Sequence, residues 1–172
     1  MIEDAAILCL EKVTEHHAQL LYSHISEPRL YAYLEDEIPQ LSEVKQKFSF
    51  AELEKSPDND TMIWLKWVAI NPQNQYIGIV EIGIFDEQYA EIGFMTFIGF
   101  QKQGYAPIYC SLAIAETQKR FSLNALYASV NEYNLASRKV VEKLGFELQK
   151  VNQNVEFIKG KISDELIYRL IF

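Results

Sequence analysis

The segment Ala90-Glu-Ile-Gly-Phe-Met-Thr-Phe-Ile98, together with the loop Gln101-Lys-Gln-Gly-Tyr-Ala106 that follows it, sets the architecture of the chain. The first part is rich in apolar, β-branched and aromatic residues, which predicts a strand. A helix is expected from Gly104 to about Phe121, with Pro107 tolerated because it falls in the first turn. A strand that leads through a glycine loop into a helix is typical of a crossover connection, so we expect a mixed sheet.

Two further β-rich runs precede this segment. They cover residues 62–70 and 76–85 and are joined by Asn71-Pro-Gln-Asn74. The connection Asp86-Glu-Gln88 leads from the second run into the strand that starts at Ala90. Both connections have hairpin length, so the three runs predict an antiparallel meander.

The N-terminal part is predicted as one strand followed by two helices. Residues 5–10 form a short apolar run, and Thr14 can cap a helix after it. An irregular segment with several aromatic residues follows between two prolines at 28–39. Ser42 can then cap a second helix that runs to about Lys55.

Downstream of the central helix we expect a strand at 126–130, a helix at 134–144 with Gly145 just after its end, and strands at 146–151 and 165–171. The predicted fold class is therefore α/β (α+β), with about seven strands and about four helices. No repeat, low-complexity tract or linker interrupts the sequence, so residues 1–172 are expected to form a single domain.

The acidic composition limits the partners that the protein can have. The 172 residues include 24 acidic and 16 basic side chains, which gives a formal net charge of −8. Because binding to nucleic acid needs a basic stripe that is lacking here, we expect no nucleic-acid partner and favour a cationic amine substrate. No run approaches the roughly 18 to 20 apolar residues of a membrane span. Since Met1-Ile-Glu-Asp4 also lacks the basic start of a secretory signal, a cytoplasmic protein with no membrane partner is expected.

The cysteines and histidines do not have the spacing typical of metal ligands. Cys9 and Cys110 lie in apolar runs without a Cys-x-x-Cys pattern, which is typical of buried thiols. The spacing of His16, His17 and His24 suits a metal poorly, and we expect them at the surface or in a substrate groove. The sequence therefore predicts no metal.

The loop Gln101-Lys-Gln-Gly-Tyr-Ala106 has the features of an anion site. It precedes a helix, whose first N–H groups lack partners and whose N-terminal end is electropositive. Small residues at Gly104 and Ala106 let a ligand approach the backbone. We expect this loop to bind a phosphate or pyrophosphate group, with an ordinary loop as the alternative.

Two motifs together resemble the GNAT N-acetyltransferase superfamily. Its signature loop, Gln/Arg-x-x-Gly-x-Gly/Ala, matches residues 101–106, and its downstream Asn-x-x-Ser matches Asn134 to Ser137 in a helix that ends in Leu144-Gly-Phe146. The order of the elements matches over essentially all 172 residues. Within the superfamily the chain most resembles the RimJ/RimL-type branch of ribosomal-protein N-acetyltransferases. The segments that carry this closer resemblance are 26–34, 90–94, 134–146 and 159–164, with Tyr168.

The resemblance implies a GNAT-type fold, mostly antiparallel, with acetyl-CoA as co-substrate and no metal. The loop would hold the pyrophosphate through backbone N–H groups, and the pantetheine arm would pair with the preceding strand while the next strand diverges from it. The residues implied are Gln101, Lys102, Gln103, Gly104, Tyr105 and Ala106 for the pyrophosphate, Phe94, Met95 and Thr96 for the pantetheine arm, and Asn134 for the opposite wall.

The resemblance also implies roles in the reaction, which needs a neutral amine, an oxyanion donor and a proton for the departing thiolate. A backbone N–H group on strand 94–96 can be the oxyanion donor. In many superfamily members a Tyr protonates the thiolate, but this chain has Val141 at that position. Ser137 is therefore implied as the general acid, as in the RimL-like branch. Glu156 lies at the position of the proposed base.

Each of these roles has an alternative. Ser137 can simply belong to the capped first turn of its helix, and Glu156 can be a solvent-facing strand residue. Glu81, Glu91 or ordered water can replace Glu156 as the base, although paired strand carboxylates are the simpler interpretation of the first two.

The function expected is transfer of an acetyl group to a primary amine of a small molecule or of a protein or peptide N-terminus, in a ternary complex. The alternative is a catalytically silent CoA-binding or interaction module on the same fold. Transfer to an aminoacyl-tRNA is disfavoured by the acidic charge. The acceptor and the oligomeric state stay open, a homodimer included.

Overall fold

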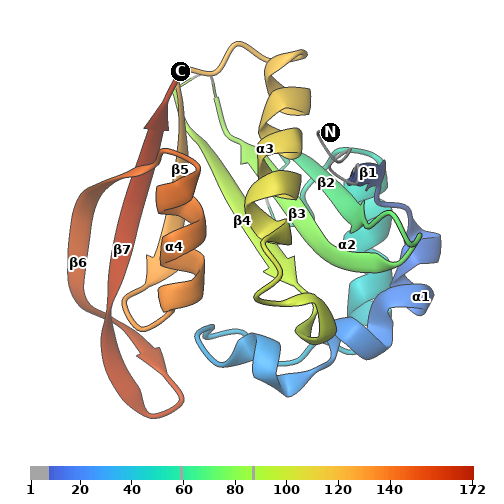
Figure 1. Ribbon diagram of the computed structural model, residues 1–172, viewed down its shortest axis with the longest axis horizontal. Helices are drawn as coiled ribbons and strands as arrows, with labels where there is room; N and C mark the ends of the chain where they lie inside the picture. The colour runs from blue at the N-terminus through green and yellow to red at the C-terminus, as the bar shows by residue number, and fades with distance from the viewer. Residues whose placement is uncertain (1–7, 59, 87) are drawn as a thin grey trace, which may run out of the picture.

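The computed structural model of the chain describes residues 8–58, 60–86 and 88–172. A central sheet of seven strands has the order β1-β2-β3-β4-β5-β7-β6 (Figure 1). The strands are β1 (Cys9–Lys12), β2 (Ile63–Ile70), β3 (Tyr76–Ile84), β4 (Ala90–Thr96), β5 (Ala125–Asn131), β6 (Glu147–Ile158) and β7 (Lys161–Ile171). The helices are α1 (Glu15–Ile25), α2 (Leu41–Glu52), α3 (Tyr105–Gln118) and α4 (Leu135–Lys143), with short 3₁₀ turns η1 (Pro28–Tyr31) and η2 (Ile98–Phe100).

The sheet is antiparallel except where β4 meets β5. These two parallel strands pair at a single position, Glu91 with Tyr127. Figure 1 shows them close together near the C-terminus and diverging toward the opposite edge of the molecule. The mixed sheet and the antiparallel meander predicted from the sequence are confirmed.

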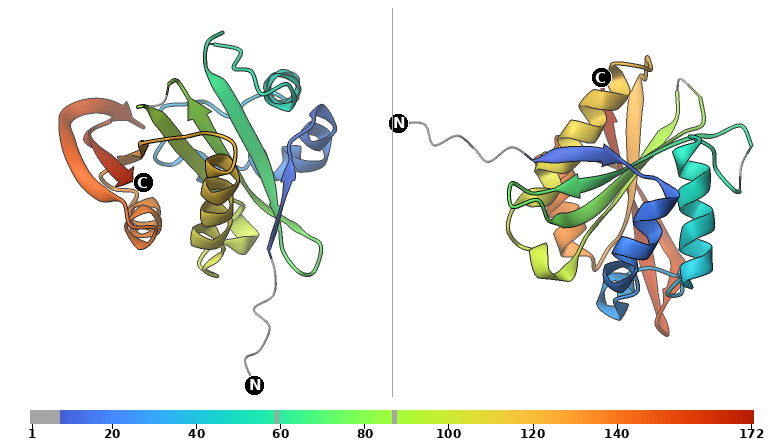
Figure 2. Two further views of the ribbon diagram at one scale, coloured as in Figure 1. Left: turned by 90° about the horizontal axis from the view of Figure 1, so that it is seen from above. Right: turned by 90° about the vertical axis from the view of Figure 1, so that its right-hand side faces the viewer.

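The helices cover both faces of the sheet, α3 and α4 on one and α1 and α2 on the other (Figure 2). One buried core packs α3 and α4 against the sheet and includes Tyr109, Ala113, Leu126, Val141 and Tyr168. The other packs α1 and α2 against β2 and β3 and includes Leu21, Phe48, Trp64, Val68 and Ile79. Each helix is thereby held by the residues that it buries against the sheet.

The start of α2 differs from the prediction. The helix begins at Leu41 and its N-cap is Gln40, whose N–H group donates to Glu43 Oε2 at 2.6 Å. The prediction that Ser42 caps this helix is wrong, because reciprocal contacts between Gln40 and Glu43 bind the free N–H groups of the first turn, and Gln40 lies two residues before Ser42. The helix ends at Glu52, short of Lys55, which makes an isolated β-bridge with Ile63.

The last two strands are longer than predicted and form a hairpin that turns at Lys159 and Gly160, both with positive φ. The sequence predicted only residues 146–151 for β6, and the missed part is 152–158. That part pairs with β7 alone, at the edge of the sheet, and its register shifts between Asn152 and Glu156. An edge strand with exposed faces does not need alternating polarity, so no pattern marks it.

Two predictions about single side chains need correction. Cys110 is buried as expected, but Cys9 is exposed because it lies on the edge strand β1. His17 is buried, and its ring Nδ1 is 3.0 Å from both the backbone nitrogen and the hydroxyl of Thr14, the predicted N-cap of α1. Of the apolar run predicted as the first strand, residues 5–7 lie outside the described residues.

No group of three or more His, Cys, Asp or Glu side chains in the described ranges could hold a metal ion. None of the helices in that part of the chain is both long and apolar enough to cross a membrane.

Candidate functional site

A slot opens where β4 and β5 separate. After the single pair of Glu91 with Tyr127, the backbone of β4 up to Thr96 has β3 as its neighbour on one side, and no strand of the described residues pairs with it on the other. Phe94, Met95 and Thr96 lie on this open edge. A free strand edge can bind an extended ligand through backbone hydrogen bonds. The divergence predicted for β5 is therefore present in the fold.

The loop after β4 lies at the same end of the slot and leads into α3. Gly104 is the N-cap residue, with φ of +79°, and Lys102 also has a positive φ of +61°. Gly104 has no side chain to cap the helix, so the first N–H groups of α3, at Tyr105 and Ala106, face outward at the electropositive helix end. Pro107 is the third helical residue and contributes no N–H group.

The glutamines of this loop bind the backbone of the residues that precede it. Gln101 Nε2 donates to the carbonyl oxygen of Thr96 at 3.1 Å, and Gln103 Nε2 donates to that of Gly99 at 3.1 Å. These side chains tie the loop to the end of β4 and to η2. The backbone, rather than the glutamine amides, is left to meet an anion.

Tyr109 joins α3 to the end of β4, and sequence reasoning missed it. Its hydroxyl lies 2.7 Å from the Thr96 hydroxyl, and the ring is fully buried. Burial raises the pKa of Tyr109. Gly78 on β3 leaves room for the ring, because a Cβ atom there would lie 3.3 Å from Tyr109 Cε1. The tyrosine thus fixes α3 against the end of β4. This contact depends on the pairing of β3 with β4, which the sequence does not show.

Asn134 and Ser137 open α4 on the β5 side of the slot. Asn134 is the N-cap residue, and its Oδ1 accepts a hydrogen bond from the Ser137 N–H group at 3.1 Å. Ser137 is half-buried, and its hydroxyl makes no hydrogen bond to the rest of the described chain. The alternative that Ser137 lies in a capped first turn is correct, and it leaves the hydroxyl available.

Glu156 is held at the carboxyl end of β5. Asn131, the last residue of β5, is buried and donates from Nδ2 to Glu156 Oε2 at 2.6 Å and to Ser163 Oγ at 2.7 Å. Burial, followed by the neighbouring carboxylates of Glu165, Glu35 and Glu132, raises the pKa of Glu156, while the Asn131 hydrogen bond opposes this. A carboxyl with a raised pKa suits a proton acceptor near neutral pH. Asn131 was missed as a site residue, although a polar residue that ends an apolar strand was visible in the sequence.

Glu156 lies on the same side of the sheet as α1 and α2, as the alternation of side chains along β5 indicates. Leu126, Ala128 and Val130 of β5 belong to the core under α3 and α4. Because side chains alternate along a strand, Asn131 faces the opposite side. Glu35, in the segment after η1, reaches this region and accepts a hydrogen bond from the Phe157 N–H group at 3.1 Å.

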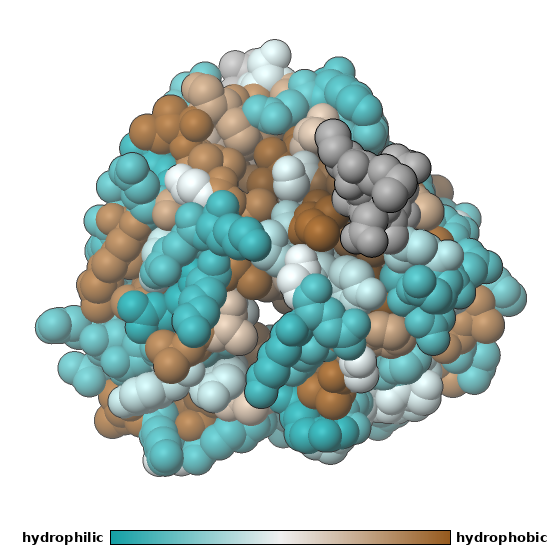
Figure 3. Space-filling model, viewed as in Figure 1, coloured by the Kyte–Doolittle hydropathy of each residue, from teal (hydrophilic) through white to brown (hydrophobic). Residues whose placement is uncertain are grey.

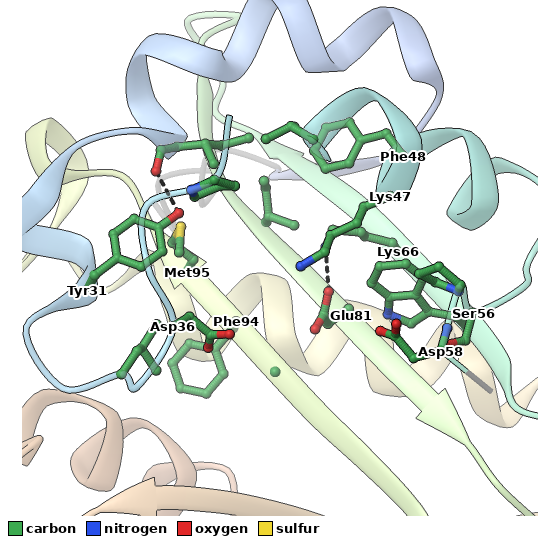
Figure 4. Close-up of a pocket in the computed structure, with 18 of the residues that line it drawn as sticks. Tyr31, Asp36, Lys47, Phe48, Ser56, Asp58, Lys66, Glu81, Phe94 and Met95 are labelled. Atoms are coloured by element: carbon green, nitrogen blue, oxygen red, sulfur yellow. Dashed lines mark hydrogen bonds and ion pairs between the residues drawn. The ribbon is translucent and has the colours of Figure 1, made fainter. Parts of the chain in front are cut away.

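A cleft of about 500 Å³ lies on that side, over β2, β3 and β4 (Figure 4). Its walls come from residues 31–39, from α2 and from residues 56–58, and it reaches Phe94 and Met95 on the open edge of β4. Ser137, Glu156 and the loop 101–106 do not line it; they lie across or beyond the slot. Figure 3 shows the surface hollowed between the two halves of the molecule at the end where β4 and β5 diverge.

The predicted site residues therefore converge from separate elements. Because β4 and β5 are parallel, their carboxyl ends lie at the same edge of the sheet, separated by the slot, and the loop before α3 and the start of α4 lie at this edge too. The predicted site residues surround this edge; they are Phe94 to Thr96, the loop 101–106, Asn134, Ser137 and Glu156. A pantetheine arm on β4 would meet an acceptor from the cleft at Phe94 and Met95.

Comparisons with known proteins agree with this geometry. The family model described as an acetyltransferase (GNAT) domain matches residues 8–147. A search of curated protein sequences gave no match.

Solved structures share the fold at low sequence identity. RimL, a ribosomal L7/L12 alpha-N-protein acetyltransferase in complex with coenzyme A, has a TM-score of 0.84 at 17% identity and covers 98% of this chain and 96% of its own. The spermidine N-acetyltransferase of Vibrio cholerae, in complex with CoA and spermine, has a TM-score of 0.81 at 18% identity with 95% of each chain covered. An acetyl transferase from Salmonella typhimurium that modifies the N-terminal serine of L7/L12 has a TM-score of 0.81 at 18% identity, covering 98% and 96%.

Proposed function

The chain belongs to the GNAT acetyltransferase family, whose members use acetyl-CoA, and we propose that it acetylates a primary amine of a small molecule or of a protein or peptide N-terminus by direct attack in a ternary complex. The observation that carries this proposal is the separation of β4 from β5 after one paired position. The slot offers a strand edge to one ligand, and the cleft brings a second ligand to the same edge.

The residues present fit acetyl-CoA. The open edge at Phe94, Met95 and Thr96 can pair with the amide groups of a pantetheine arm, as an added strand would. The backbone of 101–106, with Gly104 in the left-handed region, can bind the pyrophosphate at the start of α3. Asn134 borders the slot from α4. The bound co-substrate supplies the acetyl group as a thioester.

Three groups of the chain would serve the transfer. Glu156, whose pKa is raised, accepts the proton that the acceptor amine loses as its nitrogen bonds to the acetyl carbon. A backbone N–H group at Phe94 to Thr96 stabilises the negative charge on the carbonyl oxygen. The Ser137 hydroxyl gives a proton to the sulfur as the carbon–sulfur bond breaks, in place of the tyrosine that Val141 replaces.

Two observations support an amine as the acceptor: the charge of the cleft and the substrates of the similar proteins. The cleft carries four carboxylates, at Asp36, Glu37, Asp58 and Glu81, against two lysines, which leaves a formal charge of 2 − 4 = −2. Such a surface favours cations. The similar structures named above act on spermidine or on the N-terminal serine of a ribosomal protein.

The test is release of CoA thiol from acetyl-CoA with spermidine, butylamine and a peptide with an N-terminal serine. Wild type is expected to turn over at least one of them. Ser137→Ala and Glu156→Gln should each lower kcat by about 100-fold or more, the usual scale of general acid–base catalysis. Ser49→Ala on the surface of α2 and Glu147→Gln on the exposed edge strand β6 are matched controls that should not change kcat.

A second outcome would favour the silent CoA-binding module. In that case the protein binds acetyl-CoA in calorimetry but releases no thiol with any amine. If wild type is active but Ser137→Ala and Glu156→Gln match it, the family function stands and the assigned roles fall.

A further inference from the structure

Three residues form a row across neighbouring strands on the floor of the cleft. Lys66 on β2 is paired with Glu81 on β3, and Glu81 is paired with Gly93 on β4. All three strands are antiparallel here, so the three positions face the same side of the sheet. Lys66, Glu81 and Gly93 all line the cleft. The row ends one residue before Phe94, at the open edge of β4.

Gly93 leaves the space that the Glu81 side chain occupies. A Cβ atom at position 93 would lie 3.3 Å from both Glu81 Cγ and Glu81 Oε1. The Glu81 carboxyl group therefore extends over the backbone of β4, toward the edge where transfer would take place.

Lys66 binds one oxygen of the Glu81 carboxylate, Oε2. Its Nζ donates to Glu81 Oε2 at 2.5 Å and lies 4.6 Å from the ring centroid of Trp64 and 5.5 Å from that of Phe48. The Lys66 side chain is 11% exposed, whereas that of Glu81 is 35% exposed. The lysine is thus fixed between two rings, while the other oxygen, Oε1, makes no hydrogen bond to any part of the chain that is described (Figure 4).

The cleft has more carboxylates than it has cations to pair with them. Asp36, Glu37 and Asp58 form no ion pair among the residues described here. One lysine of the lining, Lys66, is already committed to Glu81. A ligand with a positive charge would compensate this surplus, and its hydrogen-bond donors would meet the free Oε1 atom.

We propose that Glu81 determines acceptor specificity by binding a cationic group of the acceptor other than the reacting nitrogen, with Lys66 as its positioning residue and Gly93 providing the space. This rests on the proposed function. Glu81 and Glu156 stand on the same side of the sheet, on opposite sides of the slot. An acceptor with two amines can therefore place one at Glu81 while the other loses its proton to Glu156.

The test compares 1,4-diaminobutane with butylamine, which have the same carbon chain but two amines or one. Wild type is expected to have a higher kcat/KM for the diamine. Glu81→Gln keeps the shape but removes the charge, and should reduce this preference by about tenfold or more, the scale of a charge-assisted hydrogen bond. The KM for acetyl-CoA should stay within about twofold, and the kcat/KM for butylamine should fall much less than that for the diamine.

Two further variants address the row itself. Gly93→Ala should lower the preference as Glu81→Gln does, because its Cβ atom displaces the carboxylate. Lys66→Met should raise the KM for the diamine without a matching fall in kcat, and Lys66→Arg should restore it. Glu91→Gln is the matched control, since Glu91 lies on the same face of β4 but accepts a hydrogen bond from the Tyr89 hydroxyl. It should leave the preference unchanged.

The results separate this inference from the proposed function. If wild type acetylates amines but Glu81→Gln keeps the full preference for the diamine, the role of Glu81 is wrong and the enzyme assignment stands. If wild type acetylates neither amine, the decisive measurement is calorimetric binding of 1,4-diaminobutane to the CoA-loaded protein. Binding weakened about tenfold by Glu81→Gln supports the Glu81 site; equal or absent binding overturns it.

Discussion

At the scale of single residues, the site depends on side chains whose local partners set their chemistry. Glu156 is the clearest case, because it faces other carboxylates and has one donor, Asn131. Glu81 shows the opposite arrangement, in which Lys66 binds one oxygen and leaves the other open to the cleft. The uses proposed for these two glutamates, which lie on one side of the sheet, therefore differ: Glu156 accepts a proton and Glu81 binds a positive charge.

The raised pKa of Glu156 predicts opposite effects on activity and on stability. A carboxyl with a raised pKa in the folded state is protonated more readily than in the unfolded state, so its contribution to stability is lost as pH rises through the folded pKa. At neutral pH the ionised group is therefore a net cost. Glu156→Gln should raise the melting temperature at pH 7, and its advantage over wild type should disappear at low pH, where Glu156 is protonated.

The same carboxyl should shape the pH dependence of wild-type activity. Because only the ionised form accepts a proton, kcat/KM should fall as pH drops through the raised pKa of Glu156. Melting curves and thiol release across a pH series measure both effects. A melting temperature that Glu156→Gln lowers at pH 7 would contradict the expectation.

At the scale of elements, the junctions between strand and helix build the proposed acetyl-CoA site. β4 ends at Thr96, the loop turns through Gly104 in the left-handed region, and α3 starts at once. The hydrogen-bonded hydroxyls of Thr96 and Tyr109 hold the two elements together behind the loop. On the other wall, β5 passes into α4 through the Asn134 cap. Each wall thus presents a helix start to the slot.

Gly104→Ala tests whether the loop 101–106 binds the pyrophosphate of acetyl-CoA, as proposed. A Cβ atom at Gly104 meets no other atom within 4 Å, but φ of +79° disfavours any residue except glycine. The cost is about 1 kcal/mol, equivalent to a melting temperature lower by roughly 2–4 °C. The KM for acetyl-CoA should rise several-fold while kcat changes little.

Gly160→Ala supplies the matched control for this loop. Gly160 also has a positive φ, of +81°, and open space around it, but it lies in the turn between β6 and β7. It should lose a similar amount of stability without a change in the KM for acetyl-CoA. An equal rise of that KM in both variants would show that the effect is general and not one of the loop.

At the scale of the whole molecule, three charged side chains connect distant parts of the chain. Glu54, just after α2, accepts hydrogen bonds from Lys12 of β1 at 2.9 Å and from both terminal nitrogens of Arg120, after α3, at 2.8 and 2.7 Å. These contacts link the two helix layers at one edge of the sheet. The Arg120 guanidinium and Lys12 lower the pKa of Glu54 to about 2.

Glu54→Gln tests this link through acid stability. A carboxyl with a lowered pKa stabilises the fold above its unfolded pKa of 4.5, and this contribution is lost as pH falls from there to about 2. Since the three side chains are partly exposed, the variant should lose about 1 kcal/mol or less at pH 7, or roughly 2–4 °C in melting temperature. The difference from wild type should vanish near pH 2.

A comparison on the surface of α3 controls for loss of charge alone. Glu116→Gln removes an exposed partner of Lys119 on the same helix and should not change the melting temperature measurably. A loss at Glu54→Gln that stays constant down to pH 2 would show that the pairing with Arg120 and Lys12 is not its cause.

Much of the fold was readable in the amino-acid order because the relevant forces are local. Apolar runs and turn residues predicted the meander, and the motif residues from Gln101 to Ala106 and from Asn134 to Ser137 predicted two helix starts and the family. The family model that matches residues 8–147 confirms that resemblance. The edge strand β6 was only half found, since an exposed strand needs no regular polarity.

The contacts that make the site specific depend on pairing between strands far apart in the chain. Lys66, Glu81 and Gly93 come together only through the register of β2, β3 and β4, and a shift of one residue would turn Glu81 to the other face. Asn131 meets Glu156 only because β7 lies between β5 and β6. Local propensity carries no information about such registers, which the packing of the whole sheet determines.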